Sequence, residues 1–85
     1  MPDSVYVGID VASQVLEVYC SASAKRWQVG NEASGIEALV GELHALQPAL
    51  VVLEATGGYE FEAAFALQAA GVPVAVVNPR MARDF

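Results

Sequence analysis

Two short runs of the chain are apolar and β-branched almost throughout, and each carries a carboxylate at or near its end. The first run covers residues 5–11 and contains Asp10, and the second covers residues 50–54 and ends at Glu54. Continuous apolar runs of this length are typical of strands that are buried on both faces of a sheet. We therefore predict two central strands, each of which brings an acidic side chain to the end of a buried segment.

The pattern between these two runs first becomes strictly alternating. Residues 15–20 place Leu16, Val18 and Cys20 on one face, and residues 25–29 alternate in the same way. Alternation of this kind predicts half-buried strands, and the short link between them predicts a hairpin. With the first apolar run, these segments are expected to form an antiparallel meander.

A helix is predicted between the hairpin and the second apolar run. Ser34 followed by Glu37 fits a capping box, in which the serine is the N-cap. Apolar residues then recur at the spacing of one helix face, and Pro48 ends the segment. These apolar residues are Ile36, Leu39, Val40 and Leu43.

The segment after Glu54 predicts a second helix and a further strand. A turn at residues 56–58 leads into a helix over residues 59–70, which Gly71 ends. Residues 72–77 are apolar and predict another buried strand. One side of the helix is expected to carry Phe61, Ala64, Phe65 and Gln68.

The predicted order of elements is β-β-β-α-β-α-β. A meander followed by right-handed βα crossovers gives an α/β fold with a mixed five-stranded sheet. Asn78 and Pro79 are typical of an N-cap and the first position of a third helix, which begins shortly before the last residue, Phe85. We expect one domain over residues 1–85, truncated at its C-terminal end.

Composition narrows the classes of protein to consider. The 85 residues are 55% apolar, which excludes disorder, and their formal net charge of −6 disfavours a domain that binds nucleic acid through a basic surface. A single cysteine excludes a disulfide framework. The longest stretch of low polarity, residues 69–77, falls far short of the roughly 18 residues of a membrane span. We expect no membrane association and a cytoplasmic location.

Asp10 and Glu54 are the strongest candidates for chemistry. If their strands are parallel neighbours, the strands lie about 4.8 Å apart, and two carboxylates at that distance repel each other unless a cation compensates. Mg²⁺ or Mn²⁺ is the natural partner of such oxygen ligands, and paired carboxylates support metal-assisted phosphoryl transfer. The alternative is that both acids simply mark where strands leave the core.

Other polar residues are weaker candidates, and each has a plain structural interpretation. Two candidates, Trp27 and His44, are expected to belong to the core and to a solvated helix face, respectively. Glu60 is expected in an exposed first helical turn, where an acid is favourable. Contacts to nucleic acid are conceivable at a turn serine, at a glycine turn whose amides face phosphate, and on a basic helix face. The residues concerned are Ser13, Thr56, Gly57, Arg80 and Arg83.

Three segments together resemble the N-terminal RuvC-like domain of DEDD-type insertion-sequence transposases, the bridge-RNA-guided recombinases. The likeness covers nearly the whole chain, with the segments in the right order and at plausible spacing. The segments are Gly8-Ile9-Asp10-Val11-Ala12-Ser13, Glu54-Ala55-Thr56-Gly57-Gly58-Tyr59-Glu60 and Val77-Asn78-Pro79-Arg80-Met81-Ala82-Arg83-Asp84-Phe85.

This resemblance implies a ribonuclease-H-like (RuvC-like) fold and a catalytic role in DNA transposition and recombination. It makes Asp10 and Glu54 the first two acids of a Mg²⁺-binding tetrad, while the third and fourth acids would lie beyond this chain and Asp84 would not be one of them. It also implies DNA as the substrate and a guide-type RNA that selects targets in the full-length protein. We expect low metal affinity and no strand transfer from this portion alone.

Two other functions remain open. An actin-like or sugar-kinase-type ATPase lobe would place phosphate on the loop after Asp10, although that loop, residues 11–14, contains no glycine. A non-enzymatic module that self-associates through uncovered apolar surface is the other alternative. Self-association is compatible with the transposase hypothesis, and we expect a homo-oligomer under both hypotheses.

Overall fold

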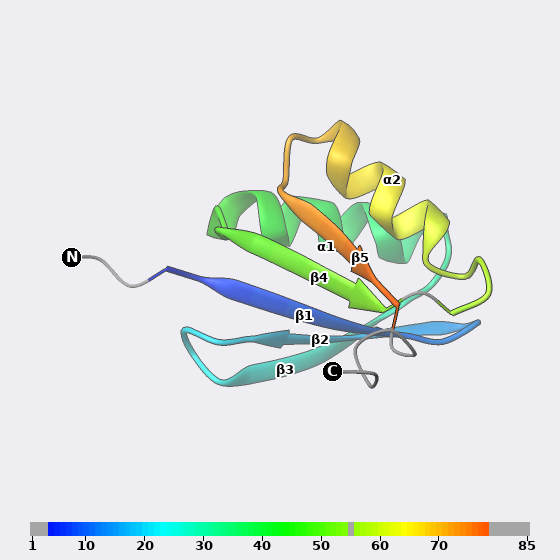
Figure 1. Cartoon of the computed structure of the whole chain (residues 1–85), viewed down its shortest axis with the longest axis horizontal. Coiled ribbons are helices and arrows are strands. Elements are labelled where there is room, and N and C mark those ends of the chain that lie inside the picture. The colour runs from blue at the N-terminus through cyan, green and yellow to red at the C-terminus, as the bar shows by residue number, and fades with distance from the viewer. Residues whose placement is uncertain (1–3, 55, 79–85) are drawn as a thin grey trace.

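The computed structural model describes residues 4–54 and 56–78, which form one five-stranded sheet with two helices packed on one side of it (Figure 1). The strands lie in the order β3-β2-β1-β4-β5. The predicted order of elements and the mixed sheet are confirmed. The elements are β1 (Tyr6–Val11), β2 (Val15–Cys20), β3 (Lys25–Gly30), α1 (Ala33–Leu46), β4 (Leu50–Glu54), α2 (Phe61–Ala69) and β5 (Val74–Val77).

The sheet combines two modes of pairing. β1, β2 and β3 pair in antiparallel fashion, as a meander with short links must. β1 also pairs with β4, and β4 with β5, in parallel, because α1 and α2 carry the chain back to the same end of the sheet before each new strand. The condition set for a shared site of Asp10 and Glu54, that the first and fourth strands are parallel neighbours, is therefore met.

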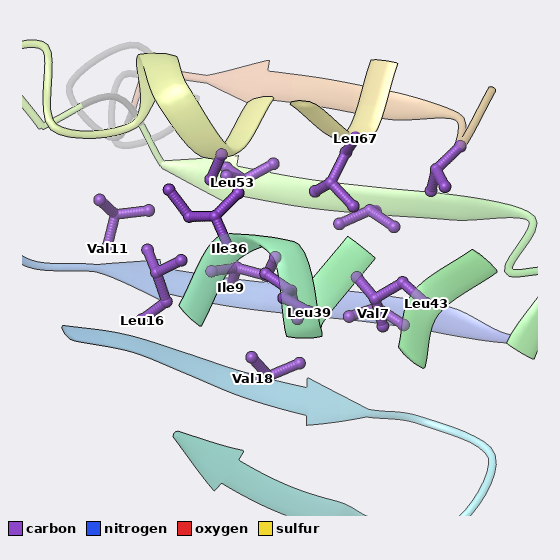
Figure 2. Close-up of a cluster of buried hydrophobic side chains, with 13 residues drawn as sticks. Val7, Ile9, Val11, Leu16, Val18, Ile36, Leu39, Leu43, Leu53 and Leu67 are labelled. Atoms are coloured by element: carbon purple, nitrogen blue, oxygen red, sulfur yellow. The ribbon is translucent and has the colours of Figure 1, made fainter. Parts of the chain in front are cut away.

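The core lies between the sheet and the two helices. Figure 2 shows Leu39 and Leu43 of α1 projecting onto Val7 and Ile9 of β1. These side chains are nearly or completely buried, and alternation along each strand explains why every second residue of β1 and β2 joins them. The buried apolar cluster comprises Val7, Ile9, Val11, Leu16, Val18, Ile36, Leu39, Leu43, Val51, Leu53, Ala63, Leu67 and Val72.

The opposite face of the sheet is uncovered within the described residues, and one prediction is therefore wrong. The strands β1 and β4 were expected to be buried on both faces, but their burial alternates, with Tyr6 and Asp10 exposed on β1 and Glu54 exposed on β4. The last strand, β5, was also expected to be buried, but its final two residues are exposed. An apolar run indicates that a strand is buried, but it does not indicate whether one face or both faces of the strand are covered. We call this uncovered side the open face.

The start of α1 also differs from the predicted capping box. The N-cap is Glu32, two residues before Ser34, and its carboxylate accepts a hydrogen bond from the Gly35 amide. Ser34 Oγ donates to the same carboxylate over 2.8 Å instead of capping the helix itself. The helix begins earlier because Glu32 satisfies one of the amides that the first turn leaves without a partner.

The buried face of α2 is not the predicted one either. Phe61 and Phe65 are 69% and 75% exposed, whereas Ala63 and Leu67 are fully buried against the sheet and α1. The buried residues of α2 are thus Ala63 and Leu67, and the aromatic rings lie outside the contact. The end of the helix is as predicted, since Gly71 adopts a positive φ of 82°.

The predicted third helix lies outside the described residues, as do Arg80, Arg83 and Asp84. Neither of the two described helices has the length and apolar character that crossing a membrane requires.

Candidate functional site

Asp10 and Glu54 lie on neighbouring parallel strands and face the same side of the sheet. The pairing of β1 with β4 includes Ile9 with Leu53, the residues directly before the two acids. Ile9 and Leu53 are buried under the helices, so the alternation of the strands directs Asp10 and Glu54 to the open face. Both acids are exposed there. The structure thus brings together the two acids that the sequence singled out.

A cavity of about 650 Å³ lies on the open face and is lined by both acids. Gly8 of β1 and Val52 of β4 also line it, and a β-carbon at Gly8 would meet no atom within 4 Å, so the sheet surface there is unobstructed. The volume lies within the range of roughly 300–1,000 Å³ that is usual for small-molecule sites. The two acids therefore have open space in front of them for a ligand.

A third carboxylate lies beside Asp10 and was missed in the sequence. Glu17 of β2 is the direct cross-strand partner of Asp10, and its carboxylate accepts a hydrogen bond from Gln28 Nε2 over 2.7 Å. Like charges directly opposite each other destabilise a sheet. The alternation of residues 15–20 already directs Glu17 away from the core, so pairing the first two strands in register would have found it.

The donor set is compatible with a hard divalent cation but is not a complete site. Carboxylate oxygens from Asp10 and Glu54 are the ligands that Mg²⁺ and Mn²⁺ prefer. Within residues 4–54 and 56–78, no three side chains of the metal-binding types gather closely enough to hold an ion. The described residues thus fit the metal through two carboxylates, and water or other ligands would have to complete the coordination.

A positive charge lies at the other end of the same cavity. The guanidinium of Arg26 stacks over the ring of Tyr19, its cross-strand partner, with 5.4 Å between the guanidinium carbon and the ring centroid. Both residues line the cavity. Stacking on an aromatic ring leaves the edge of the guanidinium free to meet an anion. The open face therefore presents carboxylates and a cation along one surface.

The loop that follows Glu54 is organised by Glu60, which corrects the expectation that Glu60 is exposed. Glu60 is only 5% exposed, and its Oε1 accepts hydrogen bonds from the amides of Thr56 at 3.0 Å and Gly58 at 3.1 Å. Gly57 and Gly58 have φ values of 68° and 105°, which glycine adopts without strain. Two of the amides that could have faced a phosphate are thus already bonded to a carboxylate.

The carboxylate of Glu60 should make stability depend on pH. The hydrogen bonds from the Thr56 and Gly58 amides, foremost that of Thr56, hold the pKa of Glu60 below its ordinary value. A lowered folded-state pKa adds stability that is fully present above the unfolded value of about 4.3 and is lost as pH falls through the folded value.

We therefore expect Glu60→Gln to be less stable than the wild type at neutral pH and to approach it in stability in acid. Urea unfolding at a series of pH values between neutrality and about 2 measures this difference. A difference that stays constant over the whole range would show that the charge of Glu60 contributes nothing.

The remaining candidates fall as follows. Ser13 is exposed in the turn between β1 and β2 and is not among the cavity-lining residues, whereas His44 is exposed on α1 as predicted. Trp27 is half-buried: it packs against the core and its Nε1 donates to Glu42 over 3.1 Å, but it also lines the cavity, so the expectation of a core tryptophan is met only in part. Arg80 and Arg83 lie outside the described residues.

Comparison with known proteins gives both the fold and the family. The fold is similar to that of T. thermophilus RuvC in complex with a Holliday junction substrate, with a TM-score of 0.68, 22% identity, and coverage of 96% of this chain and 69% of that one. A non-polymerising mutant of MamK bound to AMPPNP is more distant, with a TM-score of 0.56, 9% identity, and coverage of 94% and 42%.

No match to a curated protein sequence is found. The family model DEDD_Tnp_IS110, described as Transposase, matches residues 7–85. That match includes both helices, all five strands except Tyr6 at the start of β1, and every residue that lines the cavity. The predicted RuvC-like fold is confirmed, and the chain belongs to the DEDD transposase family of the IS110 type.

Proposed function

We propose that the protein acts in metal-dependent cleavage and transfer of DNA strands during transposition, with Asp10 and Glu54 as ligands of a Mg²⁺ or Mn²⁺ ion. One observation carries the proposal: the two acids lie on adjacent parallel strands, face one side and line one cavity, in a chain of the DEDD transposase family. The proposal concerns the full-length transposase, in which further acids would complete the site.

The acidic and basic residues of the open face would have different roles in this reaction. A divalent ion bound at Asp10 and Glu54 would supply Lewis-acid activation of a phosphodiester and offset the negative charge around it. Asp10 and Glu54 would hold their oxygens toward the cavity, while Arg26, stacked on Tyr19, would bind a phosphate oxygen at the other end. The positive charge of Arg26 matters for DNA binding because the chain as a whole carries a formal net charge of −6.

The partners follow from the same proposal. DNA is the substrate, in keeping with the Holliday junction bound to the RuvC protein that shares the fold. A guide-type RNA and a second copy of the protein would take part in the full reaction. Glu60 occupies the Thr56 and Gly58 amides, and the hydroxyl oxygen of Thr56 is buried. Gly57, whose amide Glu60 does not bind, would therefore be the residue of this turn that contacts DNA.

Strand cleavage by the full-length transposase tests the proposal. We expect nicking of its DNA substrate with Mg²⁺ or Mn²⁺ and none with a chelator, because the paired carboxylates need a divalent ion to bind a phosphodiester. Adding Mg²⁺ back to the chelated sample should restore the reaction, measured as labelled product on a denaturing gel. Cleavage that continues undiminished in the chelator would rule the proposal out.

A nucleotide-binding lobe remains the second candidate, since MamK bound to AMPPNP has a related fold. In that case the turn after Asp10 would hold the phosphates of the nucleotide. That turn contains Ser13 but no glycine, and its Ala12 amide donates to the Val15 carbonyl over 3.0 Å. The Ala12 amide is thus already used within the turn and the turn has no glycine, so we place this function second.

A further inference from the structure

A small hydrogen-bond network lies at the end of the sheet where Asp10 and Glu54 are located. It joins the turn after β1, the junction between β3 and α1, and the loop between β4 and α2. These segments are far apart in the sequence. Two polar side chains, Asn31 and Glu60, make the connections between them, and neither lines the cavity.

Asn31 bridges the two loops that follow the acids. Its Nδ2 donates to the carbonyl of Ala12 over 2.8 Å and to the carbonyl of Tyr59 over 3.0 Å. Its backbone amide donates to the carbonyl of Gln14 over 3.0 Å. A side-chain amide has two hydrogens, and both are used here to hold one carbonyl of each loop. Few side chains can replace this arrangement.

Glu60 continues the connection toward Glu54. It directly follows Tyr59, whose carbonyl Asn31 holds, and its carboxylate binds the amides of Thr56 and Gly58. Bonds from amides to a carboxylate are charge-assisted and stronger than bonds between neutral groups. Asn31 and Glu60 together therefore link the turn two residues after Asp10 to the loop two residues after Glu54.

The position of this network matters because of where the strand pairing ends. Among the described residues, the pairing of β1 with β4 runs from Tyr6 with Leu50 to Ile9 with Leu53, so the two acids come directly after its last pair. Each acid pairs instead with the strand on its other side, Asp10 with Glu17 of β2 and Glu54 with Val77 of β5. Beyond the last described pair of β1 with β4, Asn31 links the loops that follow the two acids.

We propose that Asn31 and Glu60 are positioning residues that set the separation of the Asp10 and Glu54 carboxylates, and so the affinity of the site for a divalent ion. This inference rests on the proposed metal site but concerns residues outside it. Residues that orient metal ligands typically change metal affinity by 10–100-fold when they are replaced.

The test is a Mn²⁺ titration of the protein and its variants, followed by electron paramagnetic resonance of the free ion. We expect Asn31→Leu, which keeps the size of the side chain but loses both donors, to raise the dissociation constant at least about tenfold. Glu60→Ala should also raise it, and Glu60→Gln, which keeps an acceptor oxygen, should recover much of the loss. Asn31→Asp serves in place of Asn31→Leu if the latter fails to fold.

Glu32→Ala is the matched control. It removes the carboxylate that caps α1 through the Gly35 amide, next to Asn31 in the chain, but it touches neither loop. A variant that only loosens the protein should behave like Glu32→Ala and shift the dissociation constant by less than about twofold, a far smaller change than removal of a group that orients a ligand. Equal affinities of Asn31→Leu and the wild type would overturn the inference while leaving the metal site intact.

A second readout separates failure of the inference from failure of the proposed function. If the wild type binds no Mn²⁺, the proposed metal site is wrong, and amide hydrogen exchange then decides the role of Asn31 alone. Asn31→Leu should speed exchange both at Ala12 and in the Thr56–Gly58 turn, because it releases both loops. Faster exchange confined to one of the two loops would contradict the link across the sheet.

Discussion

Replacing Leu39 with alanine is expected to lower the free energy of unfolding by about 2–5 kcal/mol, the usual range for a leucine in a closed core. Leu39 is fully buried in the middle of α1, and its side chain projects onto β1 (Figure 2). Domains of this size unfold with roughly 5–15 kcal/mol, so the loss is a large part of the total. Urea unfolding monitored by circular dichroism measures it.

Leu46 offers the matched control on the same helix. It lies at the end of α1 and is 41% exposed, so Leu46→Ala should change the free energy of unfolding by about 0.5 kcal/mol or less. Similar losses from both substitutions would contradict the packing of α1 on the sheet. Both variants make the same leucine-to-alanine change on one helix, so a difference between their free energies of unfolding reports mainly the burial of the side chain.

Removing either central acid is expected to abolish strand cleavage by the full-length transposase without unfolding it. A metal ion supplies several kcal/mol of transition-state stabilisation, so Asp10→Asn and Glu54→Gln should each lower the cleavage rate at least about a hundredfold. Asp10→Asn should leave the melting temperature unchanged or raise it in the absence of metal, since it relieves the like-charge pairing of Asp10 with Glu17. Initial cleavage rates and thermal melting measure the two effects.

Glu37→Gln is the control for these acids, because Glu37 is exposed on α1, which lies across the sheet from the cavity. It removes one negative charge and should leave the cleavage rate within about twofold of the wild type, since screening leaves distant exposed charges little influence on the site. Loss of cleavage in all three variants would point to net charge and not to the site. A marked drop in stability in Asp10→Asn would indicate that Asp10 is a structural residue.

The sequence predicted the order of the elements and the placement of Asp10 and Glu54 on neighbouring parallel strands, because both follow from local patterns and one handedness rule. An apolar run that ends in an acid indicates a strand, and a helical crossover makes the next strand parallel. The position of both acids at the same end of the sheet is then a geometric consequence.

Features that depend on tertiary contacts were not predicted. Glu60 was expected to be exposed because its neighbours suggest a first helical turn, whereas the structure folds the preceding loop around its carboxylate. The opposite error was made for the phenylalanines of α2, which were expected to lie on one helix side with other apolar residues but are exposed. Apolar character alone does not distinguish a core residue from one on an uncovered surface.

Glu17 and Asn31 were missed for a different reason. Each acts through a partner on another element: Glu17 lies opposite Asp10 across the first hairpin, and Asn31 bonds to residues 19 and 28 positions away. Such pairs cannot be found when each strand of the sequence is considered separately. The register of the first two strands places Glu17 beside Asp10, and the hydrogen bonds of the folded chain bring Asn31 to the turn after β1.

Calorimetric titration of the protein with Mn²⁺ tests the shared metal site most directly, because it needs neither DNA nor turnover. Asp10→Asn, Glu54→Gln and the control Glu37→Gln are titrated beside the wild type. We predict saturable binding by the wild type and Glu37→Gln, and affinity weakened at least about tenfold in each of the other two, since removal of one carboxylate ligand should cost no less than loss of a group that supports it. Binding that is equal in all four proteins, or negligible in all four, would contradict the assignment of Asp10 and Glu54 as joint metal ligands.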